Sequence, residues 1–240
     1  AFVDYMIDIA NEQGKFNGDI VLVKPIEFGS LDRFHDQECQ YTVQLRGIVD
    51  GEPKRINRIV TSVADAVDAY GEYQKYADYA KLDSLRYIVS NTTEAGIVYD
   101  DTDRLEMEPP KSYPGKLTKF LYERYKHFNG AMDKGLVMLP VELIDDNGIH
   151  LKECVEKLAV LWNLEEGFKT WLDEACVFTS TLVDRIVTGY PRNEADAICE
   201  ELGYKDNLID TGEIFGFWVI EGPQSIKDEF PVDKADLPIL

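Results

Sequence analysis

Hydrophobic residues occur along the chain both in short continuous runs and in longer stretches with helical spacing. The runs are rich in β-branched residues and predict buried strands, at Ile20–Val23, Leu85–Val89, Leu136–Val141 and Phe215–Ile220. Apolar positions three and four residues apart predict helices, at 1–13, Tyr70–Leu82, Ser112–Phe128, His150–Trp162 and Glu194–Leu202.

A different pattern occurs between residues 41 and 63. Tyr41–Val49 and Lys54–Val63 alternate between apolar and polar residues, and Asp50-Gly51-Glu52-Pro53 between them is a turn signal, so a hairpin is expected. Elsewhere strands and helices follow one another in turn, which is typical of an α/β fold with a mostly parallel sheet.

The stretch Leu85–Gly96 changes abruptly from an apolar strand to small polar residues. In open α/β sheets, ligands bind beyond the carboxyl ends of the strands. A ligand site there would use the polar residues of this loop, namely Asn91, Thr92, Thr93, Glu94 and Gly96. The same residue types also favour an ordinary turn, and composition alone does not separate the two interpretations.

The N-terminal helix and the strand Ile20–Val23 form the second half of a βαβ unit. In a dinucleotide-binding fold, the glycine-rich phosphate loop would lie just before Ala1, and an acid after the second strand would hold the adenosine ribose. Glu27 is the nearest candidate for that acid, although the chain holds 45 Asp and Glu residues.

The net charge of −20 disfavours binding to nucleic acids and to anionic membranes. The four cysteines lack a CxxC spacing, so reduced structural thiols in a cytoplasmic protein are expected. No apolar run is long enough to predict a membrane span. The three histidines are widely separated and predict no metal site.

A second motif, Ser180–Val187, places Asp184 and Arg185 among apolar residues. A charged pair in such a context costs desolvation energy unless it is hydrogen-bonded. Either a structural ion pair or a functional pair would account for it.

Taken together, Thr93–Gly96 and Val183–Ile186 resemble the Thr-Glu-small-Gly loop and the Val-Asp-Arg-Ile signature of the mannitol dehydrogenase family of polyol-specific long-chain dehydrogenases. Pro140–Gly148 resembles the hexuronate branch of that family. The resemblance implies a Rossmann-like domain and an NAD-dependent oxidoreductase that reduces tagaturonate, a small sugar acid, to altronate without a metal. Reduction of fructuronate to mannonate is the alternative within the family, and a non-catalytic nucleotide-binding module is the alternative from another class.

The resemblance also implies roles for single residues. Asp184 would contact the cofactor together with the Asn91–Gly96 loop, while Asn147 and Arg185 would lie toward the substrate. The catalytic lysine and histidine would lie beyond Leu240. Asn147-Gly-Ile-His150 has the Asn-x-x-His form of the catalytic motif, but the residue five positions earlier is Glu142 instead of the required lysine.

The implied organisation is a domain that is cut at both ends. Residues 1–222 would be an incomplete NAD-binding domain, and residues 223–240 would begin a linker to a missing C-terminal helical domain. The glycine-rich motif of the family would end immediately before Ala1. The 240-residue chain alone is therefore expected to be inactive.

Overall fold

The computed structural model describes residues 1–230 and 233. Its fold is built on pairs of parallel strands. The strands are β1 (Ile20–Lys24), β2 (Tyr41–Val49), β3 (Glu52–Val60), β4 (Val63–Asp68), β5 (Tyr87–Ser90), β6 (Val137–Pro140), β7 (Val177–Phe178), β8 (Ser180–Asp184), β9 (Val187–Gly189), β10 (Asp210–Glu213) and β11 (Phe217–Glu221). The helices are α1 (Val3–Glu12), α2 (Asp32–Asp36), α3 (Tyr73–Asp78), α4 (Tyr113–His127), α5 (Asn147–Leu161), α6 (Glu166–Glu174), α7 (Ala195–Leu202) and α8 (Ser225–Glu229), with short 3-10 turns η1 (Tyr79–Lys81) and η2 (Met132–Lys134).

The strands pair in four groups. β1 pairs with β4 in parallel, and β5, β6 and β7 form a parallel group. β11 pairs antiparallel with β8, which follows β7 directly in the chain. The fourth group has the order β3-β2-β10-β9, in which β10 runs parallel to β2. Within the described residues, β1 pairs only with β4 and β5 only with β6.

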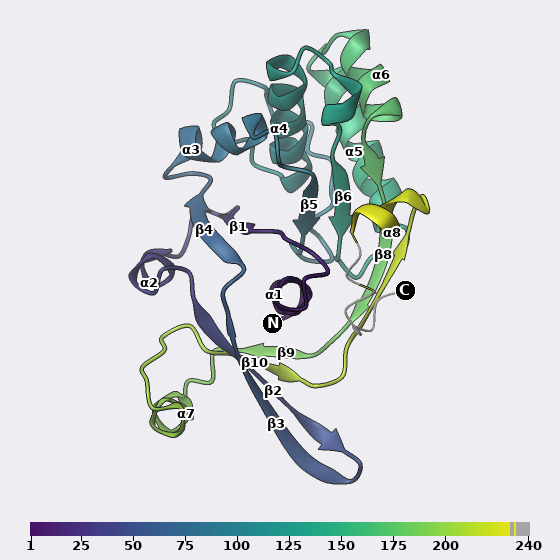
Figure 1. The fold of residues 1–240 in the computed structure, drawn as a ribbon. Coiled ribbons are helices and arrows are strands. Elements are labelled where there is room, and N and C mark those ends of the chain that lie inside the picture. Colours follow the sequence, from purple (N-terminus) through teal and green to yellow (C-terminus); the bar gives the residue numbers. More distant parts are fainter. Residues whose placement is uncertain (231–232, 234–240) are drawn as a thin grey trace.

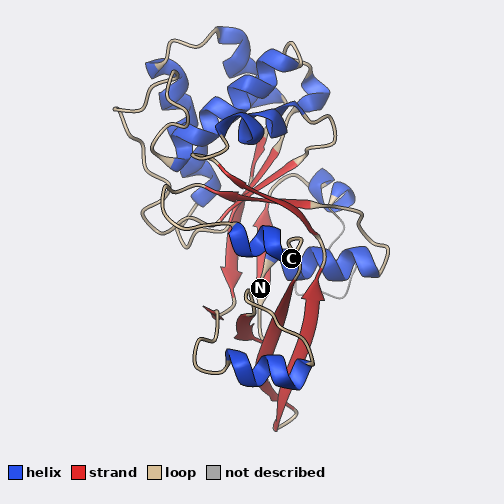
Figure 2. Cartoon of the chain, turned by 90° about the vertical axis from the view of Figure 1, so that its left-hand side faces the viewer, coloured by secondary structure: helices blue, strands red, loops and turns tan. Residues whose placement is uncertain are grey.

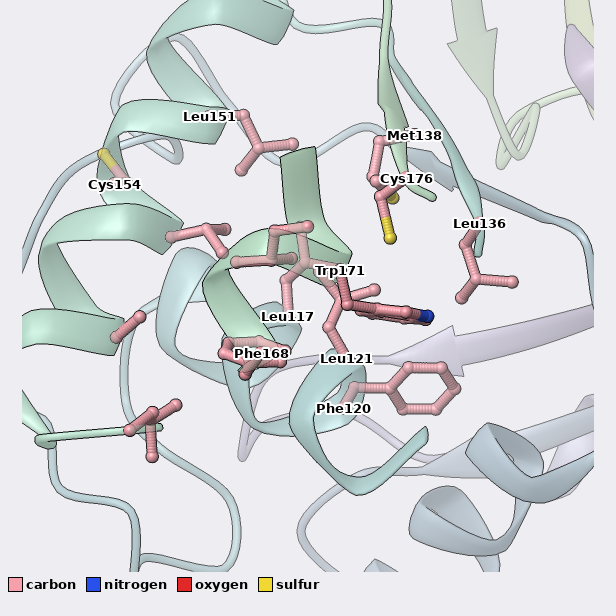
Figure 3. Packing of buried hydrophobic residues seen from close by; sticks show 14 of the residues in the cluster. Leu117, Phe120, Leu121, Leu136, Met138, Leu151, Cys154, Phe168, Trp171 and Cys176 are labelled. Atoms are coloured by element: carbon pink, nitrogen blue, oxygen red, sulfur yellow. The ribbon is translucent and has the colours of Figure 1, made fainter. Parts of the chain in front are cut away.

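Helices α3, α4, α5 and α6 gather at one end of the molecule, and the β2–β3 hairpin projects from the other (Figures 1 and 2). The main apolar cluster lies where α4, α5 and α6 cover β6 (Figure 3). It includes the fully buried Phe168, Trp171 and Leu121. Burial of such large side chains contributes about 1.5–3 kcal/mol each. This cluster therefore fixes the helices that follow β5 and β6.

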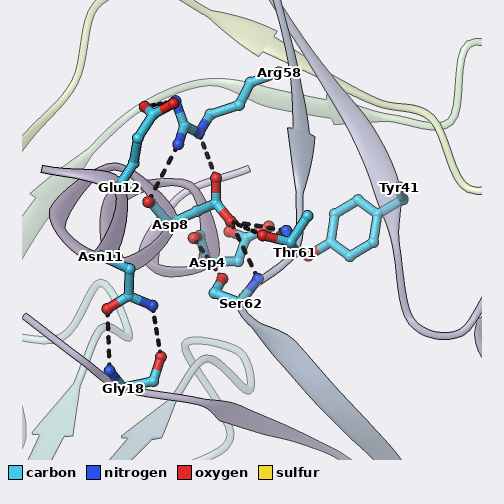
Figure 4. Close-up of polar contacts among 9 residues, drawn as sticks. All are labelled: Asp4, Asp8, Asn11, Glu12, Gly18, Tyr41, Arg58, Thr61 and Ser62. Atoms are coloured by element: carbon cyan, nitrogen blue, oxygen red, sulfur yellow. Dashed lines mark hydrogen bonds and ion pairs between the residues drawn. The ribbon is translucent and has the colours of Figure 1, made fainter. Parts of the chain in front are cut away.

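Helix α1 lies between two further apolar clusters and also carries a buried polar face. The Asp8 carboxylate accepts bonds from the backbone N–H groups of Thr61 and Ser62 at 2.7 and 3.1 Å, and pairs with Arg58 Nε at 2.5 Å (Figure 4). The Asn11 side chain bonds to both backbone groups of Gly18. These contacts fix α1 against the β3–β4 connection and set the turn that leads into β1.

The sequence pattern located most of these elements correctly. The expected strand and helix regions and the hairpin are confirmed, as is the α/β fold with its parallel pairs. Helix α5 begins at Asn147, three residues earlier than expected, and the predicted 70–82 helix is shorter, comprising α3 and η1. The elements missed were strands β4, β7, β8, β9 and β10 and helices α2, α6 and α8. β4 reads Val-Ala-Asp-Ala-Val-Asp, whose alanines and aspartates disfavour strands until β1 pairs with it.

The predicted boundary at residue 222 remains a prediction. Helix α8 and Phe230 pack against α1, because Ile226 and Phe230 belong to the same apolar cluster as Met6. Residues 231–232 and 234–240 of the predicted linker lie outside the described residues. Among the described residues, no helix has the length and apolar character needed to cross a membrane.

Candidate functional site

A buried carboxylate joins the carboxyl ends of β5 and β6. Glu142, only 3% exposed, accepts bonds from Ser90 Oγ at 3.0 Å, Thr92 Oγ1 at 2.9 Å and the Thr92 backbone N–H at 3.0 Å. Donors from the end of β5 therefore surround a carboxylate that follows β6. Hydrogen bonds to an ionised group are stronger than neutral ones, so this contact holds the loop after β5 in one position.

The loop held by Glu142 exposes the residues predicted to contact a cofactor. Asn91, Thr93 and Glu94 are exposed, while Thr92 and Gly96 are half-buried. A Cβ atom at Gly96 would lie 1.8 Å from Thr92 Oγ1, so this tight turn admits only glycine. Glu142 thus fixes the backbone of this loop, while the exposed side chains of Thr93 and Glu94 are accessible to a ligand.

Asn147 connects the same region to β8. Its side-chain amide donates to the carbonyl oxygens of Pro140, Glu142 and Thr181, and its oxygen accepts the Thr181 N–H at 2.9 Å. The residue is fully buried. Next to it, a Cβ atom on Gly148 would lie 1.9 Å from the Thr179 carbonyl oxygen. The buried amide therefore positions the start of α5 against β8.

Asp184 and Arg185 form no ion pair with each other in the part of the chain that the structure describes. The structural ion pair considered from the sequence is therefore wrong. Asp184, the last residue of β8, is exposed, and successive residues of an extended chain point to opposite sides. Arg185 turns the other way and donates to the Ala1 and Phe215 carbonyl oxygens at 2.9 and 3.1 Å. Of the apolar neighbours that suggested burial, Leu182, Ile186 and Val187 are exposed, Ile186 at 63%, while Val183 is half-buried.

Arg185 holds the start of α1. Its guanidinium lies 5.8 Å from the ring centroid of Phe2 and 5.3 Å from that of Tyr5. Burial lowers the pKa of this arginine, although Tyr5, Asp4 and Glu213 act in the opposite direction. Its donors to Ala1 and Phe215 tie α1 to the link before β11.

Glu27 follows β1, which pairs with β4 in a group separate from β5, β6 and β7. It is exposed, and the loop that carries it is bonded by Lys24, which also pairs with Asp68 at the end of β4. Lys116, at the start of α4, donates to Tyr70 Oη at 3.2 Å. Burial lowers the pKa of the Lys116 ammonium to about 8, while nearby carboxylates, including Glu27, act against this shift.

A family model of the mannitol dehydrogenase Rossmann domain matches residues 1–234. The chain belongs to the mannitol dehydrogenase family. Similar solved structures include Pseudomonas fluorescens mannitol 2-dehydrogenase in a ternary complex with NAD and D-mannitol (TM-score 0.76, 20% identity, 91% of this chain and 46% of that one). A substrate-free D-sorbitol dehydrogenase gives a TM-score of 0.77 at 19% identity, over 99% of this chain and 50% of that one. At such identities these structures support the Rossmann-like fold alone.

Curated relatives are more similar in sequence. Altronate oxidoreductase from Phocaeicola vulgatus is 46% identical over 240 residues, which cover 100% of this chain and 50% of that protein. The Bacillus subtilis protein of the same name is 46% identical over 236 residues, covering 98% and 49%. The chain thus spans about half the length of the curated relatives that it matches.

In this mannitol dehydrogenase-family domain, the structure brings together Thr92, Glu142 and Asn147 as one network and leaves Asp184, Arg185 and Glu27 outside it. Sequence reasoning missed Glu142, which it had considered only as an impossible catalytic base. A signal was available, because Glu142 follows an apolar strand directly, as Asn91 does. His150 is exposed on α5. No cluster of three or more potential metal ligands occurs among the residues described.

Proposed function

We propose that the protein to which this chain belongs is a cytoplasmic NAD-dependent oxidoreductase that reduces tagaturonate to altronate. The single observation that carries the proposal is 46% identity, over the full chain, to altronate oxidoreductases. The match to the Rossmann domain of the mannitol dehydrogenase family supports a dinucleotide cofactor. Fructuronate reduction remains the alternative substrate assignment.

The exposed polar residues after β1 and after β5 fit a dinucleotide. Glu27 presents an exposed carboxylate after β1, as a ribose diol would require, and Thr93 and Glu94 present exposed polar groups after β5. We assign Glu27 to the adenosine ribose and the Asn91–Gly96 loop to the nicotinamide side. When bound, the nicotinamide supplies the hydride for the keto carbon.

The chain's own contribution is binding and orientation. Glu142 fixes the loop that carries Thr93 and Glu94, and Asn147 keeps the start of α5 close to that loop. Asp184 is proposed to reach the cofactor from the exposed end of β8. The proton transferred to the product alkoxide is assigned to a lysine outside this chain, in agreement with the absence of a lysine five positions before Asn147.

The test uses the full-length protein with NADH and three substrates, tagaturonate, fructuronate and fructose. We expect NADH oxidation with the highest kcat/KM for tagaturonate. A higher value for fructuronate would assign the sister reaction. NADH binding without turnover of any of the three would support the non-catalytic module and overturn the proposal.

A matched pair of variants tests the loop assignment. Glu94→Gln removes the exposed charge of the loop after β5 and is expected to lower kcat/KM about tenfold or more, which corresponds to ~1.4 kcal/mol. Glu106→Gln removes an exposed carboxylate from the same β5–α4 connection and is expected to leave kcat/KM unchanged. Equal effects of the two variants would refute the assignment of Glu94.

A further inference from the structure

Lys24 is a buried lysine whose ammonium group is fully occupied. Its side chain, 9% exposed, places Nζ 2.7 Å from the Ile26 carbonyl oxygen, 3.4 Å from that of Phe28 and 3.0 Å from Asp68 Oδ2. An ammonium group has three donors, and three acceptors surround it. Two of these acceptors belong to the loop after β1, and the third stands at the end of β4.

The loop bonded by Lys24 has little else to hold it. Ile26 and Phe28 are 56% and 79% exposed, so apolar packing contributes little. Among the described residues, the hydrogen bonds to the backbone of 25–29 come from Lys24. Both acceptors flank Glu27 directly. The position of the Glu27 carboxylate therefore depends on the Lys24 ammonium.

Asp68 anchors this arrangement to the sheet. Its Oδ1 accepts the Tyr70 N–H at 3.0 Å, while its Oδ2 pairs with Lys24. Partial burial raises the pKa of Asp68, but the bonds from Lys24 and from the backbone outweigh this effect and lower it below 3.8. Asp68 is thus a fixed carboxylate at neutral pH, against which Lys24 is held.

We propose that Lys24 is a positioning residue for nucleotide recognition, which holds Glu27 at the carboxyl end of β1 where the adenosine ribose binds. This inference rests on the proposed NAD-dependent function. Lys24 itself touches no ligand, because its three donors are used within the loop and by Asp68. Its effect reaches the nucleotide only through Glu27.

The experiment measures NADH binding to the full-length protein by fluorescence titration, together with KM and kcat for NADH. Lys24→Met removes all three donors, and we expect NADH to bind about ten- to a hundredfold more weakly, with a larger effect on KM than on kcat. Lys24→Arg keeps a cationic donor and should recover most of the affinity. Lys75→Met is the matched control, because Lys75 pairs with Asp65 on β4, 2.8 Å away, and does not contact the loop.

The deciding measurement is a double-mutant cycle with Glu27→Gln. If Lys24 acts through Glu27, adding Lys24→Met to Glu27→Gln should weaken NADH binding no further. Additive losses, or unchanged affinity in Lys24→Met, would overturn the inference. If Lys24→Met does not fold, Lys24→Gln enters the same cycle. A wild-type protein that binds NADH but turns over no sugar acid would refute the proposed function alone, whereas one that binds no NADH would refute both.

Discussion

Arg124 on α4 is a fully buried arginine that is bonded to backbone carbonyls. Its Nε donates to Lys134 O at 2.6 Å, Nη1 to Ala80 O and Leu82 O at 2.9 and 2.8 Å, and Nη2 to Leu85 O at 3.0 Å. The residue is 1% exposed, and within the described residues it forms no ion pair with a carboxylate. This one side chain therefore ties α4 to the segment that enters β5.

Replacing Arg124 by methionine should strongly reduce the free energy of unfolding. Methionine keeps most of the side-chain volume but removes the guanidinium donor from four carbonyl groups, of which Leu82 O still accepts the Leu85 N–H at 3.3 Å. Each unpaired buried polar group costs about 1–3 kcal/mol, although solvent reaching the edge of the segment relieves part of the cost. Burial lowers the pKa of Arg124, so removing the charge recovers some desolvation energy. We expect a net loss of about 3–5 kcal/mol.

Urea denaturation followed by circular dichroism measures this loss, and a thermal melt should show a fall of about 6–20 °C for a domain of this size. Arg104→Met is the control, because Arg104 also donates to two carbonyl oxygens but is exposed, and it should cost less than about 0.5 kcal/mol. If Arg124→Met cost no more than Arg104→Met, the carbonyls would not depend on the guanidinium and the reasoning would fail.

Three further outcomes are expected. Asn147→Leu removes the donor to three carbonyls and the acceptor of the Thr181 N–H, although Pro140 O and Glu142 O keep bonds from Thr181 Oγ1 and the Ile144 N–H. It should lower the free energy of unfolding by about 2–4 kcal/mol, seen as a lower Tm. Because the pKa of Lys116 is about 8 when folded and 10.5 when unfolded, the unfolded chain binds more protons between these values. The wild type should therefore gain stability relative to Lys116→Met as pH rises from 8 to 10.5, and a constant difference would contradict this. Ellman's reagent should react rapidly with one thiol at most, that of half-buried Cys199, and with all four after denaturation. Rapid reaction of Cys176, whose pKa burial raises to about 12, would contradict the packing.

Local pattern was sufficient for much of the fold because hydrophobic periodicity reports which face of an element is buried. Helix α4 is the clearest case, since Leu117 and Leu121 lie one turn apart and Ser112 caps its start by accepting the Gly115 N–H. The family motifs located the loop after β5. The local pattern could not predict β10. Its four residues, Asp-Thr-Gly-Glu, form a strand only because β2 and β9 lie on either side.

The site was harder to predict for a related reason. Whether a polar residue faces a ligand or the protein depends on partners far away in sequence. Asn147 looked like a substrate contact, but its amide is used by Thr181, 34 residues away. Asp184 looked buried because its sequence neighbours are apolar, yet Leu182 is 56% exposed. Burial must therefore be known before a polar residue can be assigned a role.

The ribosome synthesises the β2–β3 hairpin long before β10, the strand that pairs with the other edge of β2. Thr42 donates its backbone N–H to Asp206, 164 residues later, and β10 follows that contact immediately. At about 5–20 residues per second, β2 waits roughly 10–30 s with one edge unpaired. During that time Val43 and Leu45, buried in the finished protein, face solvent beside an open strand edge. The nascent chain should accordingly depend on chaperones until residue 213 has emerged, whatever the stability of the completed domain.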